Sequence, residues 1–121
     1  MLRRDAIHEE LTRSVIGAFY DAYNTLGFGF LEHVYVLALE RELRARGHRV
    51  GREVGGTITY KGGVLALQRL DMVVDEVLVV ETKSTYALHP VASGQLFNYL
   101  RASVLHVGLL LHFGPKPKIH R

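Results

Sequence analysis

The chain has 121 residues and a formal net charge of +3, which suits one domain built around a single hydrophobic core. Hydrophobic residues make up 48% and charged residues 22%, an ordinary globular composition, and the lack of cysteine excludes disulfides, thiol catalysis and cysteine-bound zinc. The small positive charge permits nucleic-acid binding without indicating it.

The N-terminal sequence MLRRDAIHEEL lacks the long apolar core of a signal peptide. No apolar run approaches the length of about 20 residues that is needed to cross a bilayer. We therefore expect a cytoplasmic protein with no membrane segment.

Two amphipathic helices are expected in the first part of the chain. Apolar residues recur at helical spacing over residues 5–26, with a cap near Asp5, and the glycines of LGFGF interrupt the pattern. A second helix is expected from about residue 29 or 30 to residue 46, with Gly47 as its C-terminal stop. Its predicted buried stripe is Leu31, Tyr35, Ala38, Leu39 and Leu43.

Three strands are then expected at about 49–60, 64–74 and 77–83, with KGG in the first turn and Asp75 and Glu76 in the second. A helix follows, with Pro90 near its first turn, and then a strand within VLHVGLLLHF that is apolar on both faces and so interior to the sheet. The tail GPKPKIHR has no strong structural signal. The predicted order is ααβββαβ, an α+β or mixed α/β sandwich that forms one domain over residues 1–121.

Glu81 and Lys83 are two residues apart on a predicted strand, so their side chains leave the same face of the sheet. Asp71 lies on the preceding strand of the hairpin. A two-residue turn would place Asp71 opposite Val80, whereas a three-residue loop over 75–77 places Asp71 opposite Glu81. We therefore predict an odd-length turn or a bulge at this hairpin.

Two carboxylates and a lysine on one face can form a site for a hard cation, because Mg²⁺ prefers oxygen ligands and needs only one or two protein carboxylates. Lys83 would then orient an attacking water or stabilise charge on a phosphate. Taken alone, an acid such as Asp71 at a strand end is more often a solvated surface residue, and the Asp-x₉-Glu-x-Lys spacing is too loose to identify an enzyme.

Three further residues extend this pattern. Gln95 and Tyr99 are four apart on a predicted helix and share one face, where both side chains can hydrogen-bond to phosphate or to a metal-bound water. Glu32 lies in the first turn of the second helix, three residues before Tyr35. Each has an ordinary alternative: a surface glutamine, a partly buried core tyrosine and a helix-capping glutamate.

The segments GFLEHVY, ALERELRARG, YKGG, RLDMVVDEVLVVETKS, GQLFNYL and VGLLLHFG resemble, in order and spacing, the GxxExxY family. The resemblance covers about residues 7–114. That family belongs to the PD-(D/E)XK nuclease-like superfamily. The resemblance implies a restriction-endonuclease-like αβββαβ core, with a mixed β-sheet flanked by helices and an extra N-terminal helix.

The resemblance also implies a set of functional residues. It implies Mg²⁺ or Mn²⁺ held by Asp71, Glu81 and the main-chain carbonyl of Thr82, with Glu32 close to the ion. The implied catalytic residues are Lys83, Glu81, Asp71 and Glu32, and the implied substrate-binding residues are Gln95 and Tyr99.

This chain departs from the family pattern at three positions. Ala92 stands where many relatives have a histidine, with His89 displaced towards the preceding strand. Thr82 stands where relatives usually have a larger apolar residue, and His112 replaces the asparagine of a familiar NFG ending. None of these departures removes an implied metal ligand.

Three functional hypotheses remain. The leading one is a metal-dependent nuclease that hydrolyses phosphodiester bonds of nucleic acid, with DNA as the expected partner. The alternative is a nuclease-fold module that binds nucleic acid or protein with little turnover. A third is a junction-resolving homodimer, which would require an exposed apolar patch on the leading helix.

Overall fold

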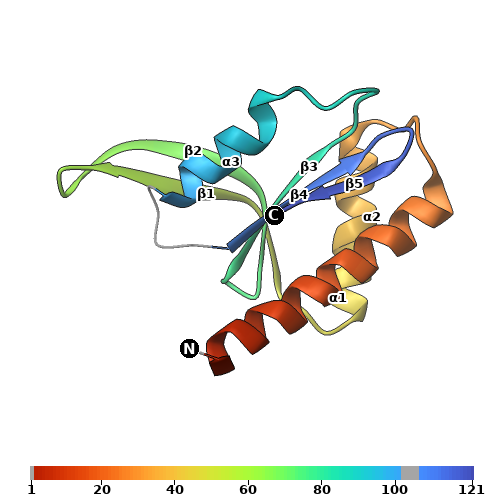
Figure 1. Ribbon diagram of the computed structural model, residues 1–121, viewed down its shortest axis with the longest axis horizontal. Helices are drawn as coiled ribbons and strands as arrows, with labels where there is room; N and C mark the ends of the chain where they lie inside the picture. The colour runs from red at the N-terminus through yellow and green to blue at the C-terminus, as the bar shows by residue number, and fades with distance from the viewer. Residues whose placement is uncertain (1, 102–106) are drawn as a thin grey trace.

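The computed structural model of the protein describes residues 2–101 and 107–121 as three helices and five strands (Figure 1). Along the chain they are α1 (Leu2–Leu26), α2 (Glu32–Ala45), β1 (Val50–Tyr60), β2 (Gly63–Val74), β3 (Leu78–Lys83), α3 (Val91–Arg101), β4 (Val107–Phe113) and β5 (Pro117–His120). The predicted order ααβββαβ is confirmed, with β5 as an additional element. The start of the last predicted strand, residues 104–106, lies outside the described residues.

The five strands form one mixed sheet in the order β1-β2-β3-β4-β5. Neighbouring strands are antiparallel except for β3 and β4, which run parallel. A parallel pair requires a crossover, and α3 lies within the connection that supplies it. The mixed sheet with its helices confirms the α+β class.

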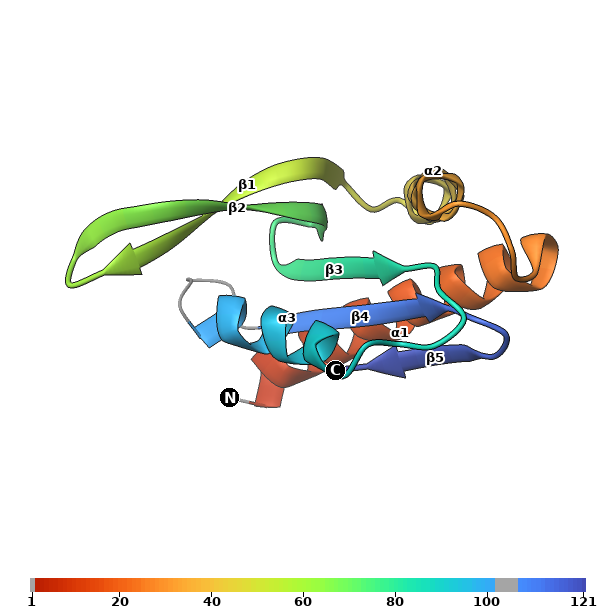
Figure 2. The same cartoon turned by 90° about the horizontal axis from the view of Figure 1, so that it is seen from above.

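The helices cover opposite faces of the sheet, because alternate residues of each strand point to opposite sides (Figure 2). Helices α1 and α2 pack on one face, over strand residues such as Leu78, Val80, Leu109 and Leu111. Helix α3 packs on the other face, over Val73, Val79 and Leu110. The strands β3 and β4 are therefore buried on both sides and form a rigid centre.

The C-terminal tail, which carries no strong structural signal in the sequence, forms the edge strand β5 beside β4. Pro117, which has no N–H to donate, is the first residue of this strand, a position where proline costs little. Ile119 packs towards the core under α1 and α2. A single apolar residue between polar ones, Ile119, was too weak a signal to predict a strand.

Both predicted helix starts are wrong. Helix α1 begins at Leu2, so Asp5 lies inside the helix rather than at its cap. Helix α2 begins at Glu32, and Leu31 precedes it in an extended conformation with 80% of its surface exposed. The predicted C-terminal stop at Gly47 is confirmed, because Gly47 has a φ of 88° and its N–H bonds the Arg44 carbonyl.

The turn between β2 and β3 is held by a chain of side-chain contacts. Asp75 accepts a hydrogen bond from the Arg49 N–H at 2.8 Å and contacts Nδ1 of His48 at 2.7 Å. The other ring nitrogen of His48 lies 2.7 Å from the hydroxyl of Ser14, in the middle of α1. Because Asp75 and Glu76 both have positive φ, these contacts stabilise a turn that is locally unfavourable.

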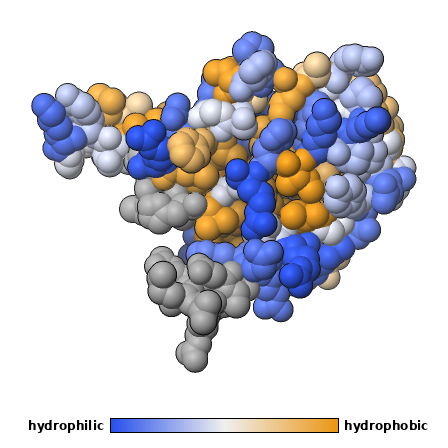
Figure 3. All heavy atoms as spheres, viewed as in Figure 1, coloured by the Kyte–Doolittle hydropathy of each residue, from blue (hydrophilic) through white to orange (hydrophobic). Residues whose placement is uncertain are grey.

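The β1–β2 hairpin extends well beyond the rest of the sheet (Figures 1 and 2), and its surface carries both hydrophilic and hydrophobic residues (Figure 3). At its base, Tyr99 of α3 lies over the backbone of Gly56. A Cβ atom on Gly56 would meet the Tyr99 ring carbon Cε1 at 2.6 Å. The absence of a side chain at this position therefore allows α3 to pack closely on the hairpin.

Two expectations concern the outer surface. Among the described side chains of α1, Tyr20 is the one exposed large apolar residue, so the apolar patch that a dimer through this helix would need is not found there.

Within residues 2–101 and 107–121, none of the helices is both long and apolar enough to span a membrane.

Gly56→Ala should lower the free energy of unfolding by about 1–3 kcal/mol, because the new methyl group overlaps the buried Tyr99 ring. Gly55→Ala, one residue earlier on the same strand, is the matched control, because a Cβ there meets nothing within 4 Å. Urea denaturation of both variants measures the difference. Equal stabilities would show that Tyr99 does not pack on Gly56 in solution.

Candidate active site

The register of the β2–β3 hairpin brings Asp71 and Glu81 together. Its pairs are Met72 with Val80, Val73 with Val79 and Val74 with Leu78, and three residues, 75–77, form the turn. The same register continued by one position places Asp71 opposite Glu81, and the Asp71 N–H donates a hydrogen bond to Oε1 of Glu81 at 3.2 Å. The predicted odd-length turn is confirmed.

Asp71 lies at a bend of β2. Leu70 and Met72, two residues apart, would share one face of a regular strand, yet Leu70 packs under α3 and Met72 packs under α1 and α2. Glu53, on the facing strand between the partners of Leu70 and Met72, has a φ of 53°. The bend therefore places Asp71 at the end of the paired part of the β2–β3 hairpin.

Thr82 holds the carboxylate of Asp71 in place. Its main-chain N–H donates to Oδ2 of Asp71 at 2.9 Å, and its hydroxyl lies 3.2 Å from the same oxygen. Thr82 is fully buried, so its hydroxyl would be costly to leave without this partner. This contact gives a structural reason for threonine between Glu81 and Lys83.

Glu32 reaches the same region through the loop before α2. The hydroxyl of Ser84, just after β3, donates to the Phe30 carbonyl at 2.7 Å. Tyr35 is fully buried, stacks on Phe113 with 4.2 Å between ring centroids, and donates its hydroxyl to the Gly27 carbonyl. These contacts tie the loop that precedes Glu32 both to the core and to the end of β3.

The segment GFLEHVY therefore divides into three physical roles. Gly29 has a φ of 119°, a conformation that residues with a Cβ rarely adopt. Glu32 is the acid, and Tyr35 fastens the loop, because its hydroxyl also accepts the Phe30 N–H at 3.3 Å. The spacing of three residues placed Tyr35 on the same face of the helix as Glu32. The contacts of Tyr35 with the loop could not be predicted, because they depend on tertiary packing.

The three acids interact electrostatically. Burial raises the pKa of Glu81 to about 7, and the negative charge of Asp71 adds to the rise, whereas the Asp71 N–H and Lys83 act to lower it. Burial likewise raises the pKa of Glu32, again with a contribution from Asp71, against Lys83 and the Ser84 amide. Negative charge is thus concentrated where water is partly excluded.

Positive side chains border these acids. A cavity of about 170 Å³ is lined by Glu32 and Asp71 together with Arg52, Arg69 and His33. Arg52 Nη1 is buried and has no hydrogen-bond partner among the described residues. The sequence analysis missed both arginines, although Arg69 lies two residues before Asp71 on the same strand.

Gln95 and Tyr99 occupy different surroundings. Tyr99 is a buried core residue in contact with Leu70 and Leu96, and Gln95 is exposed on α3. Among the described residues, no hydrogen bond joins either side chain to Asp71, Glu81 or Glu32. Their predicted role in binding substrate stays a prediction.

The donor set agrees with a hard divalent cation in its chemistry. Asp71, Glu81 and Glu32 supply carboxylate oxygens, which Mg²⁺ and Mn²⁺ prefer, and the raised pKa of Glu81 reflects burial and, after it, repulsion by Asp71, both of which a cation would offset. Within the part of the chain that the structure describes, however, no three His, Cys, Asp or Glu side chains form a ready-made cluster for an ion. Asp71 and Glu81 instead accept hydrogen bonds from main-chain N–H groups.

A mixed sheet with helices on both faces, and an acidic hairpin followed by a lysine, define a protein with the restriction-endonuclease-like fold. A model of the family described as the PD-(D/E)XK nuclease superfamily matches residues 9–121, and the chain belongs to this superfamily. A comparison with curated proteins found no match, and a comparison with solved structures also found none. The superfamily suggests a nuclease-type function and a nucleic-acid substrate.

Glu81→Gln should stabilise the metal-free protein at pH 8 and change it little at pH 4. The folded-state pKa of about 7 lies above the unfolded value of about 4.3, so the stabilising effect of protonation is lost as pH rises through 7. The expected gain at pH 8 is about 1–2 kcal/mol, or roughly 5 °C in Tm.

Thermal denaturation in EDTA at both pH values measures this effect. Glu10→Gln, an exposed glutamate on α1, is the control and should give no pH-dependent difference. The same shift at pH 4 and pH 8 for Glu81→Gln would contradict burial of a charged Glu81.

Tyr35→Phe should accelerate amide hydrogen exchange in residues 27–32 and cost about 1–2 kcal/mol, because the stacked ring stays while the hydroxyl's contacts are lost. Tyr23→Phe is the matched control, since that hydroxyl bonds the Gly114 and Pro115 carbonyls at the other end of the chain. Exchange measured by mass spectrometry should change at residues 27–32 only in the first variant. Unchanged exchange there would mean that Tyr35 does not fasten this loop.

Proposed function

We propose that this protein is a metal-dependent nuclease of the GxxExxY type, which uses Mg²⁺ or Mn²⁺ to hydrolyse phosphodiester bonds, with DNA as its substrate. The observation that carries the proposal is the juxtaposition of Asp71 and Glu81 on adjacent strands, with Lys83 next to them on β3. Two half-buried acids that repel each other destabilise the fold, and such unfavourable pairs are common at functional sites.

In the proposed reaction, Asp71 and Glu81 would hold the ion through their carboxylates, with the Thr82 carbonyl as a further oxygen donor and Glu32 close by. Such an ion would neutralise charge on the phosphate and would lower the pKa of a bound water. Lys83 donates a hydrogen bond to a non-bridging oxygen of the scissile phosphate. Water adds to phosphorus as the bond to the leaving oxygen breaks, which gives a phosphate monoester and a free hydroxyl.

Arg52 and Arg69 support this proposal from the rim. They border the same cavity as Glu32 and Asp71, so an entering phosphate would meet two guanidinium groups beside the acids. Arg69 Nη2 pairs with Glu53 of β1 at 2.6 Å, and Arg52 Nε lies 3.4 Å from Glu40 of α2, so ion pairs already position both guanidinium groups. Guanidinium groups recognise phosphate oxygens through paired hydrogen bonds.

A second candidate is a nuclease-fold module that binds nucleic acid or protein with little turnover. The observation that favours it is the lack, among the described residues, of three acidic or histidine side chains gathered for an ion. Gln95 and Tyr99 also make no hydrogen bond to the described acids, so part of the expected machinery is unassembled in this conformation.

Two measurements separate these candidates. Calorimetric titration with Mn²⁺ should show binding to the wild-type protein that Asp71→Ala abolishes and Lys83→Ala retains. Labelled single-stranded and double-stranded DNA, with RNA in parallel, should be cleaved by the wild-type protein in Mg²⁺ or Mn²⁺, and Lys83→Ala should lower the rate by about 10²-fold or more. Lys61→Ala, at the exposed hairpin tip, is the control and should cleave normally.

Mn²⁺ binding without cleavage by the wild-type protein on any of these substrates would contradict the proposed nuclease. Absence of Mn²⁺ binding at Asp71, together with retained affinity for nucleic acid, would establish the binding module instead.

A further inference from the structure

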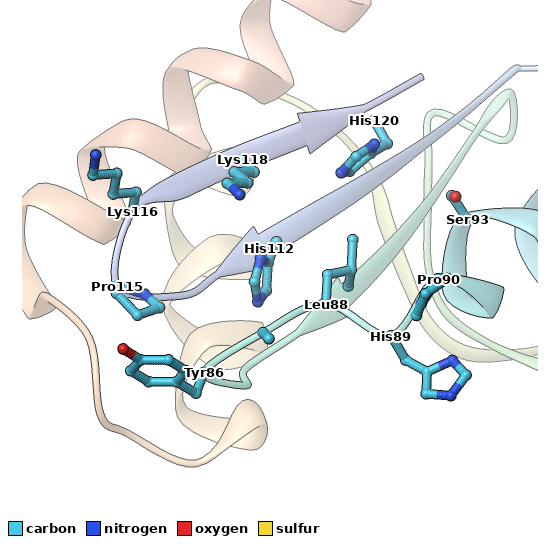
Figure 4. A pocket seen from close by; sticks show the side chains of 11 residues that line it. Tyr86, Leu88, His89, Pro90, Ser93, His112, Pro115, Lys116, Lys118 and His120 are labelled. Carbon is cyan, nitrogen blue, oxygen red and sulfur yellow. The ribbon is translucent and has the colours of Figure 1, made fainter.

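A basic cavity lies away from the carboxylates, between β4, β5 and the loop that leads into α3 (Figure 4). It has a volume of about 520 Å³. Its basic lining side chains are His89, His112, Lys116, Lys118 and His120, and no Asp or Glu is among the described residues that line it. The cavity is therefore a region of positive potential in a protein whose net charge is only +3.

The pleat of β5 produces this concentration of charge. Along KPKIH, Pro117 and Ile119 alternate with Lys116, Lys118 and His120, and Ile119 packs towards the core under α1 and α2. Lys118 and His120 therefore share the opposite face, on the side of α3, and Lys116, in the turn before β5, also lines the cavity. The alternation was visible in the sequence, but it had no meaning until β5 was known to be a strand.

The register of the sheet links this cavity to Lys83. Lys83 on β3 pairs with His112 on β4, and His112 pairs with Lys118 on β5. The three residues thus form one row across three neighbouring strands. Because neighbouring β-strands are about 4.8 Å apart, Lys118 is about 10 Å from Lys83 across the sheet. A nucleic-acid strand would cover this distance with a few nucleotides at most.

Three more polar side chains line this cavity. His112 is 2% exposed, its Nε2 contacts Thr85, and its Nδ1 is buried without a hydrogen-bond partner among the described residues. Nδ1 of His89 accepts the Val91 N–H at 3.1 Å, which leaves the ring proton on Nε2 as a donor. Ser93, in the first turn of α3, also lines the cavity, where the helix dipole favours negative charge.

We propose that this cavity binds a phosphate group of the nucleic-acid strand, next to the site of cleavage. The inference rests on the proposed function for the identity of the strand, and it adds a second phosphate contact made by residues that take no part in the chemistry. Lys116 and Lys118 supply the charge, and the ring N–H of His89 donates to a phosphate oxygen. A strand held at both points is fixed in direction relative to Lys83.

The test is Lys116→Ala/Lys118→Ala in a binding assay without cleavage. Fluorescence anisotropy in EDTA measures the affinity for short oligothymidylate strands that carry a 5′-phosphate, a 3′-phosphate or hydroxyl ends. Arg13→Ala/Arg41→Ala is the control, because it removes the same charge from exposed positions on α1 and α2, which cover the other face of the sheet.

The pocket variant should bind about tenfold more weakly than the control, and its salt slope should fall by about 0.7 for each lysine that contacts phosphate. A loss confined to one phosphorylated end identifies a terminal phosphate, whereas an equal loss for all three strands identifies an internal one. Equal affinities and equal salt slopes for the pocket and control variants would overturn the proposal.

This outcome is independent of the nuclease assay, because binding is measured in EDTA. If the wild-type protein never cleaves but the pocket variant binds more weakly than the control, the phosphate site is supported and the proposed reaction is contradicted. If the wild-type protein and the pocket variant both cleave normally and bind equally well, only the phosphate site is contradicted.

Discussion

The three-residue turn between β2 and β3 is the constraint on which the candidate site depends. Because side chains alternate along a strand, one residue more or fewer in the turn would move Asp71 to the face opposite Glu81. The turn contains two non-glycine residues with positive φ, and Ser14 of α1 and His48 and Arg49, just before β1, support it. Residues that lie 26 and 27 positions earlier in the chain thus stabilise the turn that brings the two carboxylates together.

Burial of the acids and repulsion between them oppose the folding of the site. Burial and the charge of Asp71 raise the pKa of Glu81, so the metal-free fold bears a cost at neutral pH that a neutral side chain would avoid. Main-chain N–H groups of Asp71 and Thr82 partly offset it by donating to the carboxylates. Such a balance suits a site in which a cation supplies the missing positive charge, as membership of a nuclease superfamily suggests.

Two regions of positive charge surround the acids on different elements. Arg52 and Arg69 belong to the hairpin, and the histidine- and lysine-lined cavity belongs to β4, β5 and the loop before α3. Lys83 stands between them, beside the acids and in register with His112. The modest net charge conceals this arrangement, since charge averaged over the chain carries no information about where it gathers.

The sequence by itself predicted the element order, the apolar strands and an odd-length turn that pairs Asp71 with Glu81, because alternation along a strand is a local property of the chain. A resemblance whose motif includes Gly29 and Tyr35 also singled out Glu32, whose role stays a prediction. Tertiary structure alone decided that Tyr99 packs on Gly56, that the tail forms β5, and that basic residues from three segments line one cavity. Those outcomes depend on contacts between distant segments, and no local pattern specifies which surfaces will meet.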